Sequence, residues 1–374
     1  MKINIIGEYF GDSGYNIHTK QLASALNTLG EEVSLTCNKP IGWEQNVNDA
    51  ELLMLQREST DAEVNLCINT PPTWRYYLAE GKRFVGFLVW EGTNIPSYWL
   101  EVLADDLCEQ IWVPSEHTKM AILNTININL HNKDYQKIVN KIKVVPHGVD
   151  KSLFYCNHQN SKTENLKPLT FIADKGWTSK SWEDRGGLSY LIKAFSEEFT
   201  SKDNVKLVCK VNACYGINSE ILNKNILDLQ IENEDKPKIN FIINNVNYKQ
   251  LNDIYNQGDV FVSTSLAEGF NIPCLQAQSA GLPVLTTSFG GQSDFVNNEN
   301  GWLLPAGELI SVKDDIMYEE VMWEKPNITE IRLMLRYIYN NQNEIEPKSL
   351  KSLESSSKMT WIDSAKKAQS FLKK

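Results

Sequence analysis

The sequence lacks long apolar runs and an excess of basic residues, and each absence excludes a class of protein. None of its 374 residues belong to a stretch of about eighteen apolar residues, the length that a membrane-spanning helix needs. The formal net charge is -10, from 37 basic and 47 acidic residues. Binding to nucleic acid requires a basic face that neutralises phosphates, so we expect no nucleic-acid partner. Small-molecule chemistry in an aqueous compartment fits this composition better.

Closely spaced metal ligands and a secretion signal are also missing. The seven cysteines are scattered and odd in number, with no CxxC pair, and the five histidines lie far apart. A preassembled zinc site needs clustered ligands, so we expect no metal. The first ten residues hold one lysine and a short apolar run, without a small-residue cleavage site. These features predict a cytoplasmic protein with reduced cysteines.

The length and the alternation of short apolar segments with helical stretches predict two α/β domains. A chain of 374 residues exceeds what one core usually organises. Segments typical of strands lie at 2–6, 31–37, 64–68, 84–89, 111–113 and 142–145, and again at 169–173, 205–210, 239–243, 260–263 and 284–286. Helical patterns lie at 188–199, 218–229, 248–257, 273–280, 333–339 and 361–372. Alternation of this kind is typical of Rossmann-like, doubly wound parallel sheets.

A break in this pattern marks the boundary between the domains. Pro146-His147-Gly148 interrupts it, and a polar, asparagine-rich segment at 157–167 follows. We therefore place an N-terminal domain at 1–148 and a C-terminal domain at 149–356. Two such domains predict a ligand cleft between them.

The strongest local signal surrounds Glu268. The predicted strand 260–263 ends in a polar turn that contains Glu268 and Gly269, and Pro273 suits the first turn of the helix that follows. Free amides at the start of that helix favour an anion, while Glu268 can accept hydrogen bonds from the hydroxyls of a sugar. An anion beside a sugar suggests a sugar nucleotide.

A second glycine-containing loop precedes the first helix. Its glycines are Gly7, Gly11 and Gly14, which is not the GxGxxG spacing, and the second strand ends at Cys37 without an acid. A dinucleotide is therefore not expected. The loop is interpreted either as an ordinary turn between strand and helix or as a place where backbone amides from Gly11 to Tyr15 approach a phosphate.

Taken together, these motifs resemble the retaining glycosyltransferases of family 4, which belong to the glycosyl transferases group 1 with the GT-B fold. The segment from Glu268 to Gln276 resembles the E-x7-E donor motif of that family, and Asp-Arg-Gly-Gly at 184–187 resembles its Arg-Lys-Gly turn. Further similar segments are 90–96, 112–115, 145–150, 205–210, 289–294, 301–304 and Trp361. The resemblance implies that a last helix, at about 357–374, joins the N-terminal domain.

The resemblance also implies a reaction and its residues. It implies transfer of a hexose-type sugar, with retention, from a nucleoside-diphosphate sugar to a glycan, lipid-linked or other hydroxyl acceptor in polysaccharide or glycoconjugate biosynthesis, without a metal. The donor would bind the C-terminal domain and the acceptor the N-terminal domain. The implied catalytic residues are Glu268, Arg185 and Lys210; the donor-binding residues are Gly269, Phe270, Asn271, Ile272, Gln276, Asn245, Val246, Gly11 and Gly14; and the acceptor-binding residues are Tyr15, His18, Trp90 and Glu91.

Four lysines give the end of the N-terminal domain a local basic character: Lys133, Lys137, Lys141 and Lys143. Such a group favours an anionic membrane surface that carries a lipid-linked acceptor. Four lysines are also typical of a solvated face. The sequence therefore leaves open a peripheral contact at the cytoplasmic face of a membrane.

Two positions depart from the family pattern. Gln276 stands where the second glutamate of the donor motif is expected, and Gly186 where the lysine of the Arg-Lys-Gly turn is expected. Without that lysine, Arg185 and Lys210, or else Lys175 or Lys180, must stabilise the departing phosphates. These departures keep two alternatives open: a non-catalytic protein that binds a sugar nucleotide or carbohydrate, and a sugar-nucleotide epimerase on the same fold.

Overall fold

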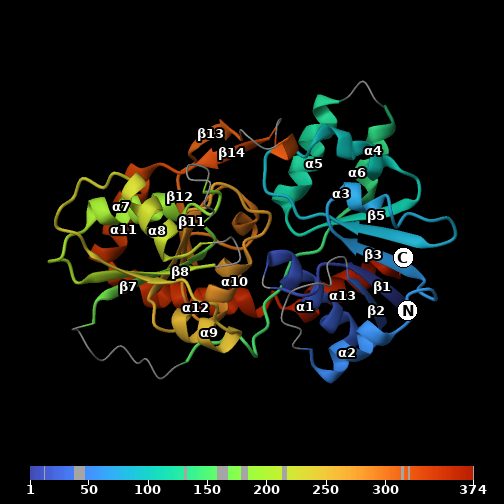
Figure 1. Ribbon diagram of the computed structural model, residues 1–374, viewed down its shortest axis with the longest axis horizontal. Helices are drawn as coiled ribbons and strands as arrows, with labels where there is room; N and C mark the ends of the chain where they lie inside the picture. The colour runs from blue at the N-terminus through green and yellow to red at the C-terminus, as the bar shows by residue number, and fades with distance from the viewer. Residues whose placement is uncertain are drawn as a thin grey trace. The chain divides into compact units, whose positions relative to one another are not determined.

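The structure, a computed structural model, contains two compact units (Figure 1). It describes residues 1–11, 13–37, 47–129, 133–157, 167–177, 184–212, 217–312, 316–318 and 321–373. The N-terminal unit comprises Met1–Gly148, Ser311–Met322 and Met359–Lys374, and the C-terminal unit comprises Val149–Ile310 and Trp323–Lys358. The chain therefore passes from one unit to the other at four positions.

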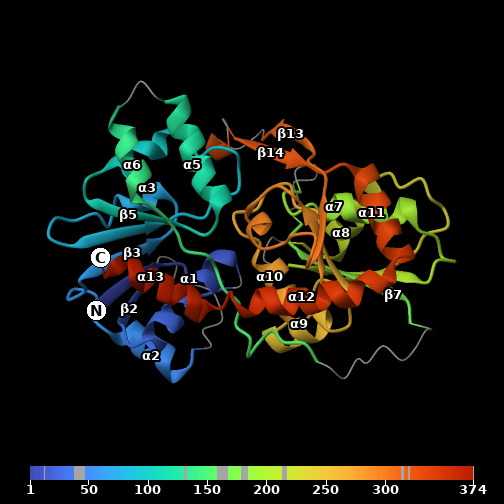
Figure 2. The same cartoon turned by 180° about the vertical axis from the view of Figure 1, so that it is seen from behind.

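The N-terminal unit is built on a six-stranded parallel sheet in the order β2-β1-β3-β4-β5-β6. Its strands are β1 (Lys2–Gly7), β2 (Glu32–Cys37), β3 (Val64–Ile68), β4 (Arg83–Phe87), β5 (Cys108–Val113) and β6 (Ile142–Val144). Its helices are α1 (Gly14–Thr28), α2 (Asp49–Gln56), α3 (Pro71–Trp74), α4 (Leu100–Ala104), α5 (Glu116–Ile128), α6 (Gln136–Lys141) and α13 (Trp361–Leu372). Figure 2 shows α13, the end of the chain, packed against α1 near its beginning.

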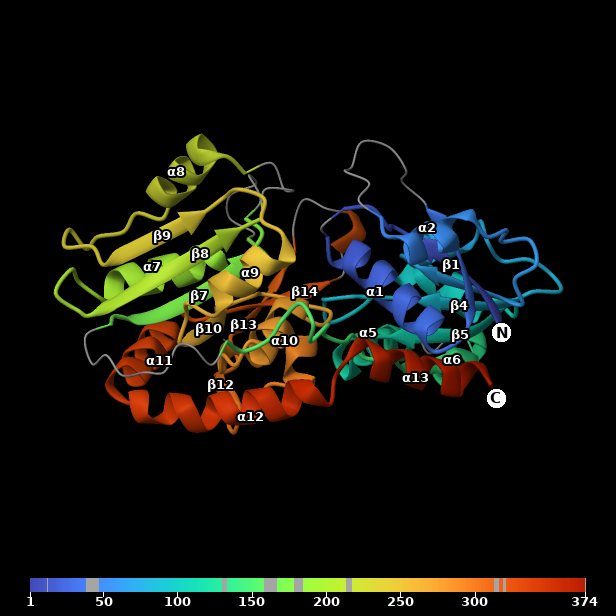
Figure 3. The same cartoon turned by 90° about the horizontal axis from the view of Figure 1, so that it is seen from below.

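The C-terminal unit contains a second six-stranded parallel sheet, in the order β12-β11-β10-β7-β8-β9. Its strands are β7 (Leu169–Lys175), β8 (Val205–Val211), β9 (Lys238–Ile242), β10 (Val260–Ser263), β11 (Val284–Thr287) and β12 (Gly301–Leu304). Its helices are α7 (Leu188–Glu198), α8 (Ser219–Asp228), α9 (Tyr248–Tyr255), α10 (Ile272–Ser279), α11 (Ile328–Asn340) and α12 (Ile345–Ser357). In Figure 3, α12 runs along α10. The strand order reverses between β7 and β10, which makes these two neighbours the switch point of the sheet.

Apolar stripes explain how the helices cover the second sheet. On α7 the buried residues Leu188, Leu191, Ile192 and Phe195 follow the spacing of one helix face. They join one core cluster with the buried strand residues and with the inner face of α11. The strands β7 and β10 are buried nearly throughout, as expected for a parallel sheet covered on both faces.

These two sheets confirm the predicted fold class of two Rossmann-like domains. All eleven predicted strands are present, with ends that shift by a few residues. The strand β12 and the helix α12 were not predicted, because β12 has only four residues and α12 is rich in serine and lysine. Among the described residues, no helix is both long enough and apolar enough to cross a membrane.

The structure differs from the predicted domain division at residues 311–322. The sequence assigned them to the C-terminal domain, but they belong to the N-terminal unit. Their first residue ends β13 (Glu308–Ser311) and their last residue begins β14 (Met322–Lys325), and these two strands pair as a two-stranded sheet. The Thr93 amide donates to the Met322 carbonyl oxygen at 3.1 Å. This partner lies more than two hundred residues away in the sequence, so no local pattern indicates it.

Two of the chain crossings lie beside an aromatic cluster in the N-terminal unit. The rings of His18 and His147 are 4.2 Å apart between centroids, and both contact Phe87 and Trp361. Gly148 contacts the backbone of Thr360 and Trp361, just after the chain has returned at Met359. The end of the first segment and the start of the last one are therefore packed together.

We expect the substitution Gly148→Ala to lower the melting temperature of the protein. An added Cβ would lie 2.2 Å from the Trp361 backbone nitrogen and 2.3 Å from the Thr360 carbonyl carbon, so backbone must move. Overpacking of this kind costs about 1–3 kcal/mol. Gly14→Ala is the matched control, since a Cβ there meets nothing within 4 Å. Equal melting temperatures for the two variants in a calorimetric scan would contradict this packing.

The buried histidines predict a loss of stability in acid. Burial lowers the pKa of His147 to about 3, and burial followed by the neighbouring His147 lowers that of His18 well below its ordinary value. The unfolded chain binds protons near pH 6.5, so the free energy of unfolding falls as the pH drops from about 6.5 towards 3, by about 2 kcal/mol per histidine at pH 5.

Urea unfolding at pH 7.5 and pH 5 measures this effect. Asp184 acts in the opposite direction, because burial raises its pKa to about 6. His147→Phe removes one histidine and leaves Asp184 unchanged, so it should reduce the acid loss at pH 5 by about 2 kcal/mol. An unchanged acid loss in that variant would show that His147 is not held neutral.

Candidate functional site

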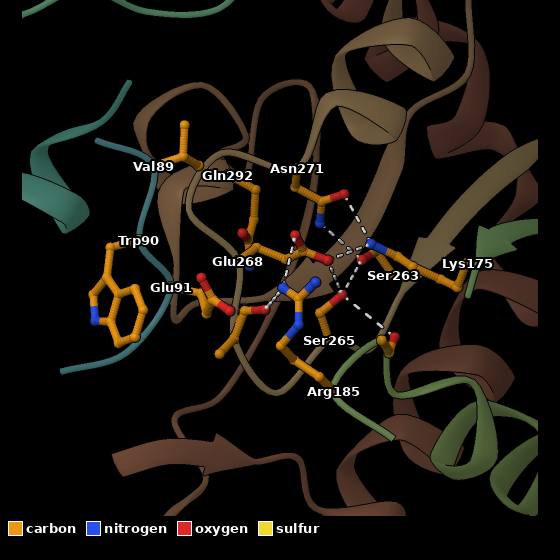
Figure 4. Close-up of polar contacts among 12 residues, drawn as sticks. Val89, Trp90, Glu91, Lys175, Arg185, Ser263, Ser265, Glu268, Asn271 and Gln292 are labelled. Carbon is orange, nitrogen blue, oxygen red and sulfur yellow. Dashed lines mark hydrogen bonds and ion pairs between the residues drawn. The ribbon is translucent and has the colours of Figure 1, made fainter. Parts of the chain in front are cut away.

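A cluster of polar side chains lies at the switch point of the C-terminal sheet (Figure 4). Lys175 is the last residue of β7, and Ser263 is the last residue of β10. Glu268 and Asn271 lie in the loop that joins β10 to α10. In open α/β sheets, ligands bind beyond the carboxyl ends of the strands at this reversal of strand order. The cluster therefore occupies the expected ligand position of this unit.

Glu268 lies at the centre of the cluster. The Lys175 Nζ donates to Glu268 Oε1 at 3.0 Å and to Asn271 Oδ1 at 2.9 Å. The Arg185 Nη1 lies 3.6 Å from Glu268 Oε2 and donates to the Ala267 carbonyl oxygen at 2.9 Å. The Ser265 hydroxyl donates to Glu268 Oε1 at 3.2 Å. One carboxylate thus holds two cations, as the dashed lines in Figure 4 show.

The charges of this cluster favour an anionic ligand. Burial raises the pKa of Glu268, but the Lys175 and Arg185 cations outweigh it, so the pKa lies below its ordinary value and the carboxylate is ionised. Lys175 and Arg185 thus face the Glu268 carboxylate from two sides, while the Asp184 carboxylate lies close enough to Lys175 to interact with it electrostatically. The Lys175 side chain is 6% exposed, while that of Arg185 is 37% exposed. Arg185 is therefore the cation that solvent and a ligand reach first.

The loop after β10 has a backbone conformation that asparagine suits. Asn271 has φ +73, in the left-handed region that asparagine adopts more readily than most other residues. Its side chain amide donates to Ser263 Oγ at 2.9 Å and accepts from Lys175. Asn271 precedes α10, whose start has Pro273 and no side-chain cap. The positive end of that helix therefore lies next to the Lys175 and Glu268 pair.

A tight glycine turn positions Arg185. The Leu266 amide donates to the Arg185 carbonyl oxygen at 2.9 Å, and the Thr264 hydroxyl donates to that of Gly187 at 2.7 Å. Gly187 has φ +72, and a Cβ there would lie 1.8 Å from the Thr264 carbonyl oxygen. A Cβ on Gly186 would lie 2.9 Å from the Gly176 carbonyl oxygen. In this turn a lysine at Gly186 would require a shift, and Lys175 supplies the second cation from β7 instead.

Lys210, which the sequence grouped with Arg185, lies beside a different carboxylate. Its Nζ donates to the Val211 carbonyl oxygen at 3.1 Å, and the side chain is buried at the end of β8. Burial raises the pKa of Asp174, and the nearby Lys210 cation opposes that rise. The Tyr255 hydroxyl donates to Asp174 Oδ2 at 2.8 Å. Lys175, and not Lys210, is thus the lysine that bonds to Glu268, while Lys180 lies outside the described residues.

The remaining residues of the C-terminal unit that were predicted to bind the donor lie in the loop after β10, in α10 and in the loop between β9 and α9. Phe270, Ile272 and Gln276 are buried, and Gln276 lies on α10. The Gly291 amide donates to the Glu268 carbonyl oxygen at 2.8 Å, so the loop at 289–294 supports the turn at Glu268 and Gly269. Asn245 and Val246 lie in the loop between β9 and α9, where Asn245 is exposed. Sequence reasoning gave no role to Ser265, although it follows the predicted strand directly.

In the N-terminal unit, the predicted residues separate into two groups. Tyr15 donates from its hydroxyl to the Val89 carbonyl oxygen at 3.1 Å, which links α1 to the loop that contains Trp90 and Glu91. Gly11 has φ +125, and Gly14 begins α1, whose start is capped by Ser13.

His18 and Trp90 are corrections to the sequence interpretation. His18 is fully buried in the aromatic cluster, so its position fits packing and not contact with an acceptor. Trp90 is 2% exposed and has the ring of Tyr318 stacked on it, with centroids 5.1 Å apart. A sugar therefore has no open face of Trp90 to stack on. The residues that cover them come from distant parts of the sequence: Trp361 contacts His18, and Tyr318 contacts Trp90.

Within the described residues there is no group of three or more histidine, cysteine, aspartate or glutamate side chains that could hold a metal ion.

Comparison with known families agrees with this location of the site. Residues 178–326 match the family model described as glycosyl transferases group 1. This match confirms the resemblance to group 1 glycosyltransferases, and it includes Arg185, Glu268 and α10.

Two curated relatives match parts of the chain. The GtfA subunit of a UDP-N-acetylglucosamine–peptide N-acetylglucosaminyltransferase from Streptococcus agalactiae is 27% identical over 162 residues, which is 39% of this chain and 31% of the relative. An uncharacterized glycosyltransferase from Methanocaldococcus jannaschii is 32% identical over 121 residues, or 32% of this chain and 29% of the relative. The chain spans about a third of the length of these relatives.

Solved structures resemble the whole chain. A glycosyltransferase from Rickettsia africae has a TM-score of 0.70 at 16% identity, covering 100% of this chain and 97% of that one. Anabaena HepE in complex with UDP-glucose has a TM-score of 0.65 at 14% identity, covering 100% and 99%. Sucrose-phosphate synthase from Thermosynechococcus elongatus has a TM-score of 0.69 at 15% identity, covering 100% and 98%. These likenesses confirm the predicted GT-B fold.

The buried pair of Lys175 and Glu268 makes a prediction about stability. Glu268→Gln leaves the buried Lys175 cation without its counter-charge, so we expect a loss of about 3 kcal/mol in urea unfolding. Adding Lys175→Met should recover part of that loss, because the unpaired charge is then removed. Asp228→Asn breaks the exposed pair between Lys224 and Asp228 and serves as the control, with a small effect. Additive losses in the double variant would contradict this pairing.

Proposed function

We propose that this protein is a retaining glycosyltransferase of family 4 that moves a hexose-type sugar from a nucleoside-diphosphate sugar to a hydroxyl acceptor. The observation that carries the proposal is the cluster of Lys175, Arg185 and Glu268 at the switch point of the C-terminal sheet. A diphosphate needs cations and free amides, and a sugar needs an acceptor of hydrogen bonds from its hydroxyls. This cluster offers both within one loop system.

Each side chain has a role in the proposed reaction. The bond between the anomeric carbon and the diphosphate breaks, and its electron pair passes to the phosphate oxygen. Arg185 and Lys175 stabilise the negative charge that develops there, because their positions are fixed before the reaction begins. The acceptor oxygen bonds to the same face of the anomeric carbon, and its proton passes to the departing phosphate. Glu268 fixes the sugar through its hydroxyls.

The other predicted residues surround this centre. We assign Gln276 to the ribose, the backbone near Asn245 and Val246 to the base, and Glu91 to the acceptor. Lys210 neutralises Asp174 at the same sheet edge. Uridine is the base to test first, because HepE has been solved with UDP-glucose and a pneumococcal O-GlcNAc transferase GtfA with UDP and GlcNAc.

Contacts within the N-terminal unit argue for a solvated role of its lysines. Lys137 pairs with Asp106 at 2.6 Å, and Lys141 donates to the carbonyl oxygens of Leu103 and Asp105. The Lys143 Nζ donates to the Asn140 carbonyl oxygen at 3.0 Å. Lysines held in this way favour the solvated face over a membrane surface, while the side chain of Lys133 lies outside the described residues. The proposed acceptor is thus a hydroxyl compound that reaches the protein in the cytoplasm.

Isothermal titration calorimetry with UDP and UDP-glucose tests the proposal. We expect Arg185→Ala to weaken binding of UDP about tenfold, since it removes a cation from the diphosphate. Glu268→Gln should instead abolish the advantage of UDP-glucose over UDP, and leave UDP bound as well or better because a nearby negative charge is gone.

The control variant is Arg75→Ala, which breaks an exposed pair with Glu101 at 3.1 Å in the N-terminal unit. It should leave both affinities unchanged. ADP, GDP and their glucose conjugates are measured in parallel, because a different base would change the donor and not the reaction. If Arg185→Ala and Glu268→Gln both bind every nucleotide as the unmodified protein does, the proposed donor site is wrong.

A further inference from the structure

The inserted segment Ser311–Met322 contacts the loop that follows β4 in the N-terminal unit. This loop contains Trp90, Glu91 and Thr93 and lies at the carboxyl edge of the first sheet. The segment comes from the C-terminal half of the sequence, so the loop is completed by residues more than two hundred positions away. Carboxyl edges of parallel sheets are where such folds bind ligands.

Tyr318 makes two contacts with this loop at once. Its ring stacks on Trp90, with centroids 5.1 Å apart and an angle of 20° between the planes. Its hydroxyl donates to Glu91 Oε1 at 2.6 Å, the short distance expected for a hydrogen bond to a carboxylate. Trp99 also packs against Trp90 in an edge-to-face arrangement, with ring centroids 4.8 Å apart. Tyr318 is therefore fixed by stacking while its hydroxyl orients the Glu91 carboxylate.

The inserted segment also fits closely against the backbone of the loop. Met322 and Thr93 exchange two hydrogen bonds, both at 3.1 Å, one of them to the Thr93 hydroxyl. A Cβ on Gly92 would lie 2.0 Å from a methyl group of Val321, so glycine is required for this approach. Val321 itself is buried. Tyr318, Val321 and Met322 are therefore packed in place against the loop.

Three further side chains hold the backbone of the loop through hydrogen bonds. The carbonyl oxygens of three successive residues, 89 to 91, accept hydrogen bonds from Tyr15 at 3.1 Å, Thr118 at 2.8 Å and His117 at 2.8 Å. A loop whose carbonyl oxygens are bonded at three successive residues presents the Trp90 and Glu91 side chains in a fixed orientation. Support of this kind is what a binding site requires of the residues around it.

We propose that Tyr318 is a positioning residue that holds Glu91 to accept a hydrogen bond from a hydroxyl of the carbohydrate acceptor. A carboxylate accepts several hydrogen bonds at once, so it can hold the phenol and a sugar hydroxyl together. The inference rests on the proposed function, and it assigns part of the acceptor subsite to a segment encoded in the C-terminal half. In this proposal the ring of Tyr318, and not a sugar, stacks on Trp90.

The variant Tyr318→Phe tests this role, because it keeps the stacking ring and removes only the hydroxyl. The assay measures transfer from UDP-glucose to p-nitrophenyl β-glucoside and p-nitrophenyl β-N-acetylglucosaminide, and calorimetry measures the affinity for UDP. We expect the KM for the better glycoside to rise about tenfold, with an unchanged affinity for UDP. If Tyr318 served only folding, the variant would instead change kcat, the KM for the glycoside and the affinity for UDP together.

Two controls separate positioning from other effects. Tyr337→Phe removes another tyrosine hydroxyl that donates to a glutamate, from Tyr337 on α11 to Glu344, and should leave the KM for the glycoside unchanged. In a Glu91→Ala background, Tyr318→Phe should have no further effect, because its target is absent. The inference would be overturned if Tyr318→Phe had the same KM for the glycoside as the unmodified protein. It would also be overturned if Tyr318→Phe raised that KM by the same factor in the Glu91→Ala background.

Failure of the proposed function gives a different pattern. If the unmodified protein binds no nucleoside-diphosphate sugar, the donor assignment is wrong whatever Tyr318 does. The inference about Tyr318 is then judged by saturation-transfer NMR, which detects binding of the two glycosides without turnover. Weaker binding by Tyr318→Phe than by Tyr337→Phe supports the inference, and equal binding or no binding by any variant overturns it.

Discussion

The buried ion pair between Lys175 and Glu268 is the constraint on which the candidate site depends. Removing two charges from water costs several kcal/mol each, and their attraction offsets that cost only when the remaining donors and acceptors are bonded as well. Asn271 and Ser265 provide those bonds. Buried pairs of this kind add little to stability, so their position at the switch point is better explained by ligand binding. The same pair ties β7 to the loop after β10, which defines the edge of the site.

Strained and tightly packed backbone is concentrated around that pair. Asn271 is in the left-handed region, Gly187 has positive φ, and Gly186 has no space for a side chain without a shift. The left-handed conformation costs free energy at Asn271 and persists because its surroundings fix it, whereas glycine meets the positive φ at 187 and the close packing at 186 without strain. Together they bring three separate segments to one carboxylate: the end of β7, the turn at 184–187 and the loop before α10. A loosely packed loop would not hold two cations within reach of one acid.

Local patterns predicted much of this architecture, because they depend on neighbours in sequence. Apolar runs indicated the strands, and Pro273 with Gly281 indicated α10. The polar turn that follows β10 indicated Glu268. The identity of its main cation was not predictable in this way, since Lys175 lies 93 residues earlier and meets Glu268 only because β7 pairs with β10. The packing of His18 was not predictable for a related reason, because Trp361, which its ring contacts, is at the other end of the chain.

The inserted segment shows that the first 148 residues do not form the whole of the N-terminal unit. The first 148 residues contain Glu91 and His18, but Tyr318 and Trp361, which contact them, come from later segments. Just beyond Met322, the Glu324 amide donates to the Leu266 carbonyl oxygen at 3.0 Å, two residues before Glu268. The strand β14 therefore supports the loop that contains Glu268, and the Tyr318 hydroxyl, a few residues before β14, donates to Glu91. A chimera that carried only the N-terminal half of this chain, joined to the C-terminal half of a relative, would contain Glu91 without Tyr318, whose hydroxyl bonds to it.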